Sequence, residues 1–229
     1  EARRLFYLPL ALWFIPVISV RFSSETWSGI LFLLSLSIFF SESKNTLKPF
    51  LIGLIFGFSF LFRFQIGFII LGFILWVFVY KHASIKYLFK VITALTCVIL
   101  LGVLIDSWFY GELVFAPWKY FKLVLESGGD GFGASNWYYY FIKILSYPSY
   151  FIGAPLLISL ILILIYKRDN FLLWCILPFI IIHSLIPHKE ERFLFPIIYL
   201  FPLALMEGYI IFEIICRNKS FLKLISFLL

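Results

Sequence analysis

Apolar runs alternate with short polar breaks along most of the chain. A transmembrane helix needs about 20 apolar residues, and fewer where it is short or partly buried by protein, so this pattern predicts about eight of them. The expected spans cover residues 5–20, 26–40, 49–62, 66–80, 91–105, 150–166, 171–187 and 193–216. The hydrophobic pattern therefore predicts an all-α, polytopic membrane protein that forms a single transmembrane domain over residues 1–229.

The longest interruption of this pattern is residues 106–148, which we expect to form one long non-cytoplasmic loop. Within it, Trp118, Phe121 and Leu125 recur at helical spacing, and the neighbouring lysines lie off that stripe. This spacing predicts a short helix over residues 115–126 that lies in the membrane interface. The helix could roof a cavity that opens to the lipid, or it could be a connector anchored by its aromatic side chains; the sequence favours neither.

Two further features of this loop allow a functional and a structural interpretation. Residues 128–133 are glycine-rich, but they lack the strand-to-helix context and the Lys-Ser/Thr pair of a phosphate-binding loop, so we expect a flexible turn. Trp137 and the three tyrosines that follow it suit an aromatic belt at the membrane interface. Stacking of these rings on a sugar is the less favoured alternative.

The composition supports the membrane assignment. Of all residues, 63% are hydrophobic and only 14% are charged, whereas soluble domains have about 25% charged residues. The net charge of +7 does not indicate a nucleic-acid partner, because the basic residues punctuate apolar runs instead of forming a patch. Cys97, Cys175 and Cys216 show no CxxC spacing, so we interpret them as buried apolar fillers, neither disulfide-bonded nor metal ligands.

The basic residues also set the expected orientation. When the spans are alternated, most of the 19 Lys and Arg residues fall on one side, which the positive-inside rule makes cytoplasmic. The other side receives residues 106–148, residues 21–25, Arg63 and residues 188–192, together with most of the acidic residues. We therefore expect the chemically equipped face to be luminal or extracytoplasmic.

The polar run of residues 188–192 lies between two apolar segments and combines an imidazole, two cations and carboxylates. Lys189 and Arg192 lie on the side that the positive-inside rule disfavours for basic residues, and an anionic ligand would explain them. The alternative is a solvated loop that only obeys topology. His183 lies inside the preceding span, where we expect a hydrogen-bonded core histidine and no ligand role.

Three other charged positions on the same side are candidates. Asp106 follows the fifth expected span, where it could be solvated or could pair across a cavity with a cation of residues 188–192. Arg63 interrupts an apolar hairpin, and it could reach headgroups or bind a lipid phosphate. Arg21 and Glu25 are four residues apart and could form a local pair.

Two motifs resemble a known family. Residues 188–193 (HKEERF) resemble the HKExRF signature of the dolichyl-phosphate-mannose-dependent mannosyltransferases, and Phe195-Pro196 extends the match. Residues 106–111 (DSWFYG) are similar to the D-x-x-F-Y-G segment that starts the long luminal loop of that family. These are polytopic GT-C enzymes of glycosyltransferase family 22, which act in GPI-anchor and asparagine-linked glycan assembly.

Two weaker matches support this resemblance. Gly133, Trp137 and Tyr140-Phe141 resemble a G-x-x-P-W-x-x-Y-F stretch, with Asn136 where the family usually has proline. The turn of residues 21–25 resembles an arginine–serine–glutamate turn that follows an early span in the family. The order and spacing of the motifs agree across nearly the whole chain.

The resemblance implies a function and a set of partners. It implies an inverting transfer of mannose from a polyprenyl-phosphate donor, dolichyl-phosphate-mannose in eukaryotes, onto a lipid-linked or surface glycan at the luminal face, with no cofactor or metal. The family's general base is an acidic residue in the first luminal loop. Because the chain begins at Glu1 and has one methionine, we expect a piece of a longer chain, with the base upstream and the piece alone inactive.

The resemblance also implies roles for the candidate residues. Lys189, Arg192 and Arg63 are expected to contact the donor phosphate, His188 and Glu190 to orient groups or bind glycan, and Asp106 to act as a supporting anchor. Further supporting residues are Trp108, Tyr110, Trp137, Arg21 and Glu25.

Organism and rival functions complete these expectations. The Phe-, Ile- and Lys-rich composition suggests an A+T-rich genome. In a bacterium the protein would lie in the cytoplasmic membrane and build surface glycans, and in a eukaryote it would lie in the endoplasmic reticulum membrane. The rival function is a transporter or lipid flippase with a charged extracytoplasmic gate, but transporters usually place polar residues near the bilayer midplane and not at span ends. A non-catalytic scaffold is the third alternative.

Overall fold

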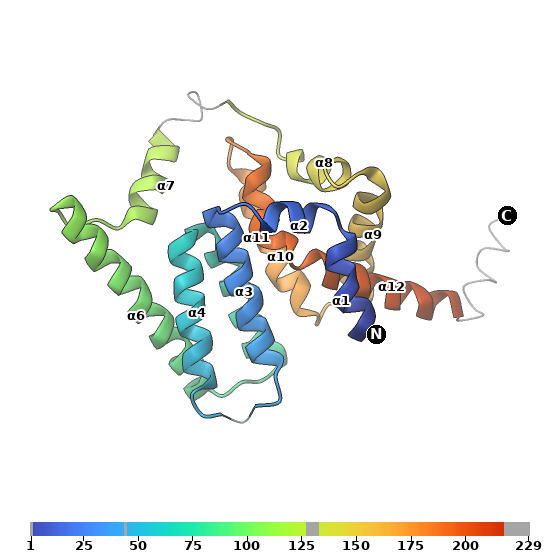
Figure 1. Ribbon diagram of the computed structural model, residues 1–229, viewed down its shortest axis with the longest axis horizontal. Helices are drawn as coiled ribbons and strands as arrows, with labels where there is room; N and C mark the ends of the chain where they lie inside the picture. The colour runs from blue at the N-terminus through green and yellow to red at the C-terminus, as the bar shows by residue number, and fades with distance from the viewer. Residues whose placement is uncertain (1, 44, 127–132, 218–229) are drawn as a thin grey trace.

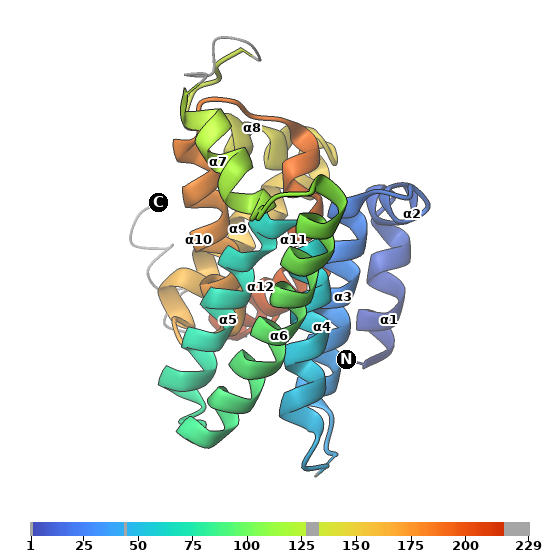
Figure 2. The ribbon, with the colours of Figure 1, turned by 90° about the vertical axis from the view of Figure 1, so that its left-hand side faces the viewer.

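The computed structural model describes residues 2–43, 45–126 and 133–217. All regular secondary structure in these ranges is helical, which confirms the all-α prediction. Figures 1 and 2 show a set of long helices with short helices gathered at one end.

The first half of the chain forms an antiparallel set of helices. It comprises α3 (Ser24–Phe40), α4 (Lys48–Phe62), the 3₁₀ turn η1 (Phe64–Ile66), α5 (Gly67–Tyr80) and α6 (Ile85–Tyr110). The Ser23 hydroxyl caps α3 by accepting from the Thr26 N–H. Glycine lets α4 and α6 approach closely, because a Cβ on Gly53 would lie 2.2 Å from the Val91 carbonyl oxygen.

The rest of the chain packs beside this set. It comprises α1 (Ala2–Ala11), α2 (Phe14–Ser19), α7 (Ala116–Glu126), α8 (Tyr139–Ser146), α9 (Tyr150–Tyr166), α10 (Phe171–Leu185), η2 (Glu191–Leu194), α11 (Phe195–Ile198) and α12 (Phe201–Arg217). A Cβ on Gly72 would lie 1.8 Å from the Trp174 carbonyl oxygen, so α5 and α10 are in close backbone contact. That contact joins the two halves of the chain.

The helices do not reproduce the predicted count of spans. Only α6, with 26 residues, is long and apolar enough to cross a membrane by itself among the described residues. The number rises to three if α9 with α10, bent by 118°, and residues 191–198 with α12, bent by 65°, each form one span. The shorter apolar helices are α3, α4 and residues 64–80. The structure thus supports an all-helical membrane protein, and eight separate spans are not shown.

Aromatic side chains fill the core between α3, α4 and α5. The rings of Phe32 and Phe56 stack with centroids 5.6 Å apart, and Phe73 meets both rings edge-on. Of the three cysteines, Cys175 is buried as predicted. Cys97 and Cys216 are exposed, so their interpretation as buried fillers was wrong. Both lie on helix faces that no neighbouring helix covers, and such apolar faces are open to lipid in a membrane protein.

The connections between helices gather at two opposite ends (Figures 1 and 2). One end carries residues 20–23, Arg63, and residues 111–115, 133–138 and 186–190. We call it the row end, after the row of charged side chains described in the next subsection. The opposite end, with residues 41–43, 45–47, 81–84 and 167–170, is the basic end. The last of these turns is tied to α5, because the Trp76 Nε1–H donates to the Asp169 carbonyl oxygen at 2.5 Å. The connections sort into the two groups that the alternation of spans predicts.

Candidate functional site

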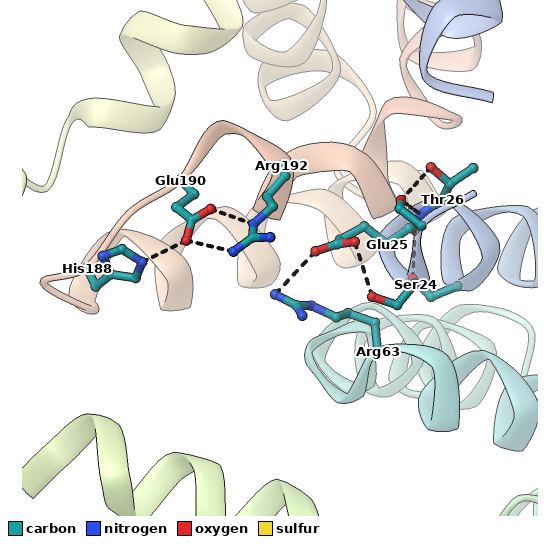
Figure 3. Close-up of polar contacts among 9 residues, drawn as sticks. Ser24, Glu25, Thr26, Arg63, His188, Glu190 and Arg192 are labelled. Carbon is teal, nitrogen blue, oxygen red and sulfur yellow. Dashed lines mark hydrogen bonds and ion pairs between the residues drawn. The ribbon is translucent and has the colours of Figure 1, made fainter. Parts of the chain in front are cut away.

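Glu190 organises the polar run of residues 188–192. Its Oε1 accepts a hydrogen bond from His188 Nε2 at 2.9 Å and another from Arg192 Nη2 at 2.9 Å. Arg192 Nε also contacts Glu190 Oε2, so the guanidinium holds the carboxylate in a two-pronged pair. Glu190 has extended backbone geometry and immediately precedes η2, in which Arg192 is the second residue. Figure 3 shows the three side chains in one line.

A second ion pair continues this line from the other half of the chain. Arg63 Nη2 lies 3.5 Å from Glu25 Oε1, and the Glu25 side chain is only 6% exposed. Arg63 stands in extended geometry at the break between α4 and η1, and Glu25 lies in the first turn of α3. We call Glu25, Arg63, His188, Glu190 and Arg192 the charged row.

The expected local pair of Arg21 with Glu25 is not formed. Arg21 is exposed and makes no ion pair within the described residues. Glu25 turns inward, where it pairs with Arg63 and accepts from the Ser24 hydroxyl at 3.1 Å. The packing of α4 on α3 therefore selects a partner that is distant in sequence.

The ring of Phe193 joins the two ion pairs. The Arg63 guanidinium carbon lies 5.3 Å from its centroid and that of Arg192 lies 5.9 Å from it, both within cation–π range. In Figure 3 the two guanidinium groups approach each other between their carboxylate partners. An arginine has five N–H donors, so each group keeps donors that its carboxylate does not use.

The helix predicted at residues 115–126 exists as α7. The Tyr120 ring of this helix meets Phe64 of η1 with centroids 5.3 Å apart, which places α7 beside the segment that carries Arg63. The side chains of Phe121 and Leu125 lie outside the described residues, as does the expected turn of residues 128–133 except for Gly133.

Lys189 is arranged differently from the other members of its motif. Its Nζ donates to the carbonyl oxygens of Ser135 at 2.8 Å and of Ile186 at 2.6 Å, and the residue is 8% exposed. The Ser135 N–H in turn donates to the Pro187 carbonyl oxygen at 3.0 Å. Burial lowers the pKa of the Lys189 ammonium. Lys189 thus ties residues 133–136 to the loop that carries the charged row.

The charge state of the row follows from its contacts. Burial raises the pKa of the Glu190 carboxyl, but the hydrogen bonds from Arg192 and His188 outweigh burial and bring this pKa below its usual value. Glu190 is therefore an anion at neutral pH and keeps Arg192 in place. Within the described ranges, no group of three or more His, Cys, Asp and Glu side chains could hold a metal ion.

A further ion pair at this end was not indicated by the sequence. Lys143 of α8 pairs with Glu191 of η2, and its ammonium also lies 5.4 Å from the Tyr139 ring centroid. Lys143 is a basic residue on the side that the positive-inside rule disfavours, and this was the available signal. The sequence did not indicate that α8 packs against η2. This pair fixes α8 beside the row.

Asp106 lies outside the charged row. Its carboxylate is partly exposed and makes no hydrogen bond or ion pair with any described residue, so the expected pairing with Lys189 or Arg192 is not formed. The end of α6 that carries it diverges from the helices around the row (Figure 1). Beside it, Trp108 is 84% exposed, and Tyr110 lies 5.8 Å from the Lys119 ammonium. These residues belong to the same end of the molecule but not to the same cluster.

His183 lies in the core beneath the row. Its Nδ1 is 2.8 Å from the Phe179 carbonyl oxygen, and its ring packs near those of Tyr140 and Phe193. This agrees with the expected hydrogen-bonded core histidine. Trp137, the remaining aromatic candidate, is 65% exposed and lies at the start of the segment that leads into α8.

Comparison with known proteins supplies a family. Residues 2–229 match the family model described as the Alg9-like mannosyltransferase family. The chain is 32% identical to the mouse alpha-1,2-mannosyltransferase ALG9 over 56% of its own length and 23% of the relative's. It is 33% identical to the zebrafish GPI alpha-1,2-mannosyltransferase 3, over 44% of this chain and 19% of the relative. It is 36% identical to the ALG9 protein of Saccharomyces cerevisiae, over 40% of this chain and 17% of the relative.

These alignments reach only part of each protein. They cover about a fifth of the length of the curated relatives. No solved structure gave a significant match.

Proposed function

Because the chain belongs to the Alg9-like mannosyltransferase family, we propose that it forms part of an enzyme that transfers mannose from a polyprenyl-phosphate donor to a lipid-linked glycan. The relatives reported above are all named as alpha-1,2-mannosyltransferases, and the name of the zebrafish protein also refers to GPI. No observation favours the transporter alternative. The acceptor is thus assigned here only as a lipid-linked glycan.

The reaction defines what the site must provide. The oxygen of an acceptor hydroxyl forms a bond to the anomeric carbon of mannose, and the bond from that carbon to the phosphate oxygen breaks. The lipid phosphate leaves with the bonding electrons, and the hydroxyl proton passes to a general base. Negative charge therefore grows on the departing phosphate, and groups that stabilise it there accelerate the transfer.

The convergence of Arg63 and Arg192 on the Phe193 ring is the observation that supports a phosphate site here. Arginine is suited to phosphate because its planar group offers several fixed N–H donors. Arg192 is 56% exposed and Arg63 is 21% exposed, so both can meet a ligand from outside. We assign the donor phosphate to the space between these two groups.

The other residues of the motif are assigned to positioning. Glu190 fixes the Arg192 guanidinium, His188 fixes Glu190, and Lys189 fixes the loop through two carbonyl oxygens. Glu25 does the same for Arg63. Because both carboxylates of the row are engaged with arginines, we assign the general base to neither.

The end of α6 receives a supporting role. Asp106, Trp108 and Tyr110 lie at the row end, where they anchor the start of the long loop at the membrane interface. The row end is the luminal or extracytoplasmic end in this proposal, because the alternation of spans along the sequence assigns most of the 19 Lys and Arg residues to the opposite side. The membrane is that of the endoplasmic reticulum in a eukaryote and the cytoplasmic membrane in a bacterium.

Substitution of Arg192 tests the phosphate assignment. In membranes that contain the complete gene product, Arg192→Ala should lower kcat/KM for polyprenyl-phosphate-mannose by about 100-fold, because a charge-assisted contact to the departing phosphate is lost. The matched control is Arg217→Ala, which removes another arginine paired with a glutamate, Glu213, away from the row. Equal donor kinetics in both variants, at equal protein levels, would overturn the assignment.

A further inference from the structure

A small groove lies beside the charged row. Its volume is about 280 Å³, and it is open to the outside of the molecule. Its lining residues come from the end of the long loop and the first turn of α8: Ala134, Ser135, Asn136, Tyr138, Tyr139 and Ile142. None of these six residues is Asp, Glu, Lys, Arg or His. The lining of the groove therefore suits a neutral ligand.

The wall of this groove is held in place before any ligand arrives. The Ser135 carbonyl accepts from the Lys189 ammonium, and its N–H donates to the Pro187 carbonyl. The Asn136 carbonyl accepts from the Tyr139 N–H at 3.1 Å, which fixes the entry into α8. A preorganised wall loses little conformational freedom on binding, which favours affinity.

The groove combines aromatic faces with neutral hydrogen-bonding groups. The Asn136 amide donates to the Tyr138 hydroxyl at 2.7 Å, and Tyr138 remains 42% exposed. Trp137 does not line the groove, but it adjoins it: it is 65% exposed, and its ring lies 5.8 Å from that of the lining residue Tyr138. A sugar presents an apolar C–H face and a rim of hydroxyls, so it matches both kinds of group.

The groove also lies where a second substrate is needed. Its Ser135 wall is bonded to Lys189, which stands between His188 and Glu190 of the charged row. In Figure 3 the segment before α8 passes close to the His188 end of the row, away from the two arginines. A transferase must hold a neutral acceptor hydroxyl next to an anionic donor. Here the groove adjoins the charged row, which carries the proposed phosphate site.

We propose that this groove binds neutral mannose residues of the acceptor glycan, with Asn136 and Tyr138 bonding the hydroxyls of a ring in the groove and the adjoining Trp137 stacking on a ring at its edge. This inference rests on the proposed mannosyl transfer for its biological role. It differs from an aromatic belt, in which Trp137 would only anchor the protein in the interface and would contact no substrate.

Kinetics separate these two roles of Trp137. In the complete gene product, Trp137→Ala should raise the KM for the lipid-linked acceptor about tenfold, through loss of one aromatic contact, and should leave the donor KM within about twofold. Asn136→Ala should act in the same direction. The control is Tyr150→Ala, which removes another aromatic side chain, 66% exposed at the start of α9 and outside the groove.

Two results would overturn the groove assignment. One is an acceptor KM in Trp137→Ala that equals that of Tyr150→Ala, and the other is a change in donor KM instead of acceptor KM. The latter would mean that the groove holds the mannose of the donor. If Arg192→Ala leaves donor kinetics unchanged while Trp137→Ala raises the acceptor KM, the phosphate assignment fails and the groove assignment stands.

A direct binding measurement keeps the inference testable without transfer activity. Saturation-transfer NMR with α-linked mannobiose and the purified, detergent-solubilised protein should show binding in the wild type and in Tyr150→Ala. The signal should be lost in Trp137→Ala and in Asn136→Ala. Retention of the full signal in Trp137→Ala and in Asn136→Ala would contradict the inference.

Discussion

The two ends of the molecule use the same kinds of charged residue in different ways. At the row end, ionic and hydrogen-bonded contacts join segments far apart in the chain, as in Arg63 with Glu25 and Lys189 with the Ser135 carbonyl. At the basic end, most contacts are local and exposed: Lys48 donates to the Ser41 carbonyl, and Arg168 donates to the Leu164 carbonyl one turn before it. Two described contacts at this end are long-range: Lys167 with Glu207, and the Trp76 Nε1–H with the Asp169 carbonyl.

This difference distinguishes charged residues that only set membrane topology from charged residues that form a functional site. A basic end that only obeys the positive-inside rule needs charge in its loops and no fixed geometry. The row end instead orients two guanidinium groups over one buried ring, and it buries both a carboxylate and an ammonium to do so. Burial of charged groups is costly, so the geometry at this end is the feature that a function explains.

The largest expected difference between the two ends is the stability lost when the basic partner of a glutamate is removed. Arg63→Ala leaves the Glu25 carboxylate, 6% exposed, without its cation, and should cost about 3–5 kcal/mol of stability. Lys167→Ala leaves Glu207, 29% exposed, and should cost less than about 1 kcal/mol. Unfolding of the detergent-solubilised variants by denaturant measures both values.

A second substitution checks the cause of this loss. In the Arg63→Ala background, Glu25→Gln removes the uncompensated charge and should restore most of the stability without restoring donor use. Similar losses for Arg63→Ala and Lys167→Ala would mean that the two ends do not differ as described.

A smaller effect is expected from the lysine that ties the loop. Lys189→Met keeps the side-chain length but removes the donor to the part-buried carbonyls of Ser135 and Ile186, at about 1–3 kcal/mol for each carbonyl that water does not reach. Lys48→Met at the basic end frees the exposed Ser41 carbonyl, which water can satisfy, so its effect should be within about 0.5 kcal/mol.

Hydrogen exchange locates this effect in the chain. The Ser135 N–H, which donates to the Pro187 carbonyl, should exchange faster in Lys189→Met, because the loop segments separate more often. Lys189→Arg retains a cationic donor and should keep most of the protection. Unchanged exchange in Lys189→Met would show that Lys189 does not hold the loop.

The smallest expected effect is the change of donor KM with pH that arises from Glu190 of the charged row. The pKa of Glu190 is lowered in the folded protein, so its contribution is present above the usual carboxyl pKa and is lost only as the pH falls through the lowered value. Donor KM should therefore change less than about twofold between about pH 8 and pH 5 from this group. A rise in donor KM over that range that Glu190→Gln abolishes would contradict the assignment.

The sequence predicted the helical architecture and the position of the row, because both depend on local pattern. Apolar runs and their polar breaks identify the helices, and the HKEERF motif marks the loop at residues 188–193. The pattern does not give helix breaks or bends. The run at residues 193–216 was predicted as one span, but it divides into α11 and α12 after η2.

The contacts of the row could not be predicted from spacing. Arg21 and Glu25 have the spacing of a helical pair, yet the packing of α4 on α3 gives Glu25 to Arg63. Lys189 was expected to face a ligand with Arg192, but the extended loop directs its ammonium inward to two carbonyls. The direction of a side chain in a loop depends on the tertiary contacts around it, which the order of residues does not reveal.

The central claim is that Arg63 and Arg192 act together on one phosphate of the donor. A double-mutant cycle with Arg63→Gln, Arg192→Gln and the double variant tests it, with kcat/KM for polyprenyl-phosphate-mannose measured per folded enzyme. Once one arginine is lost, the phosphate is no longer fixed and the second matters less, so the double loss should be about fivefold smaller than the product of the single losses. A double loss equal to that product would show that the two arginines act independently, and would contradict the account.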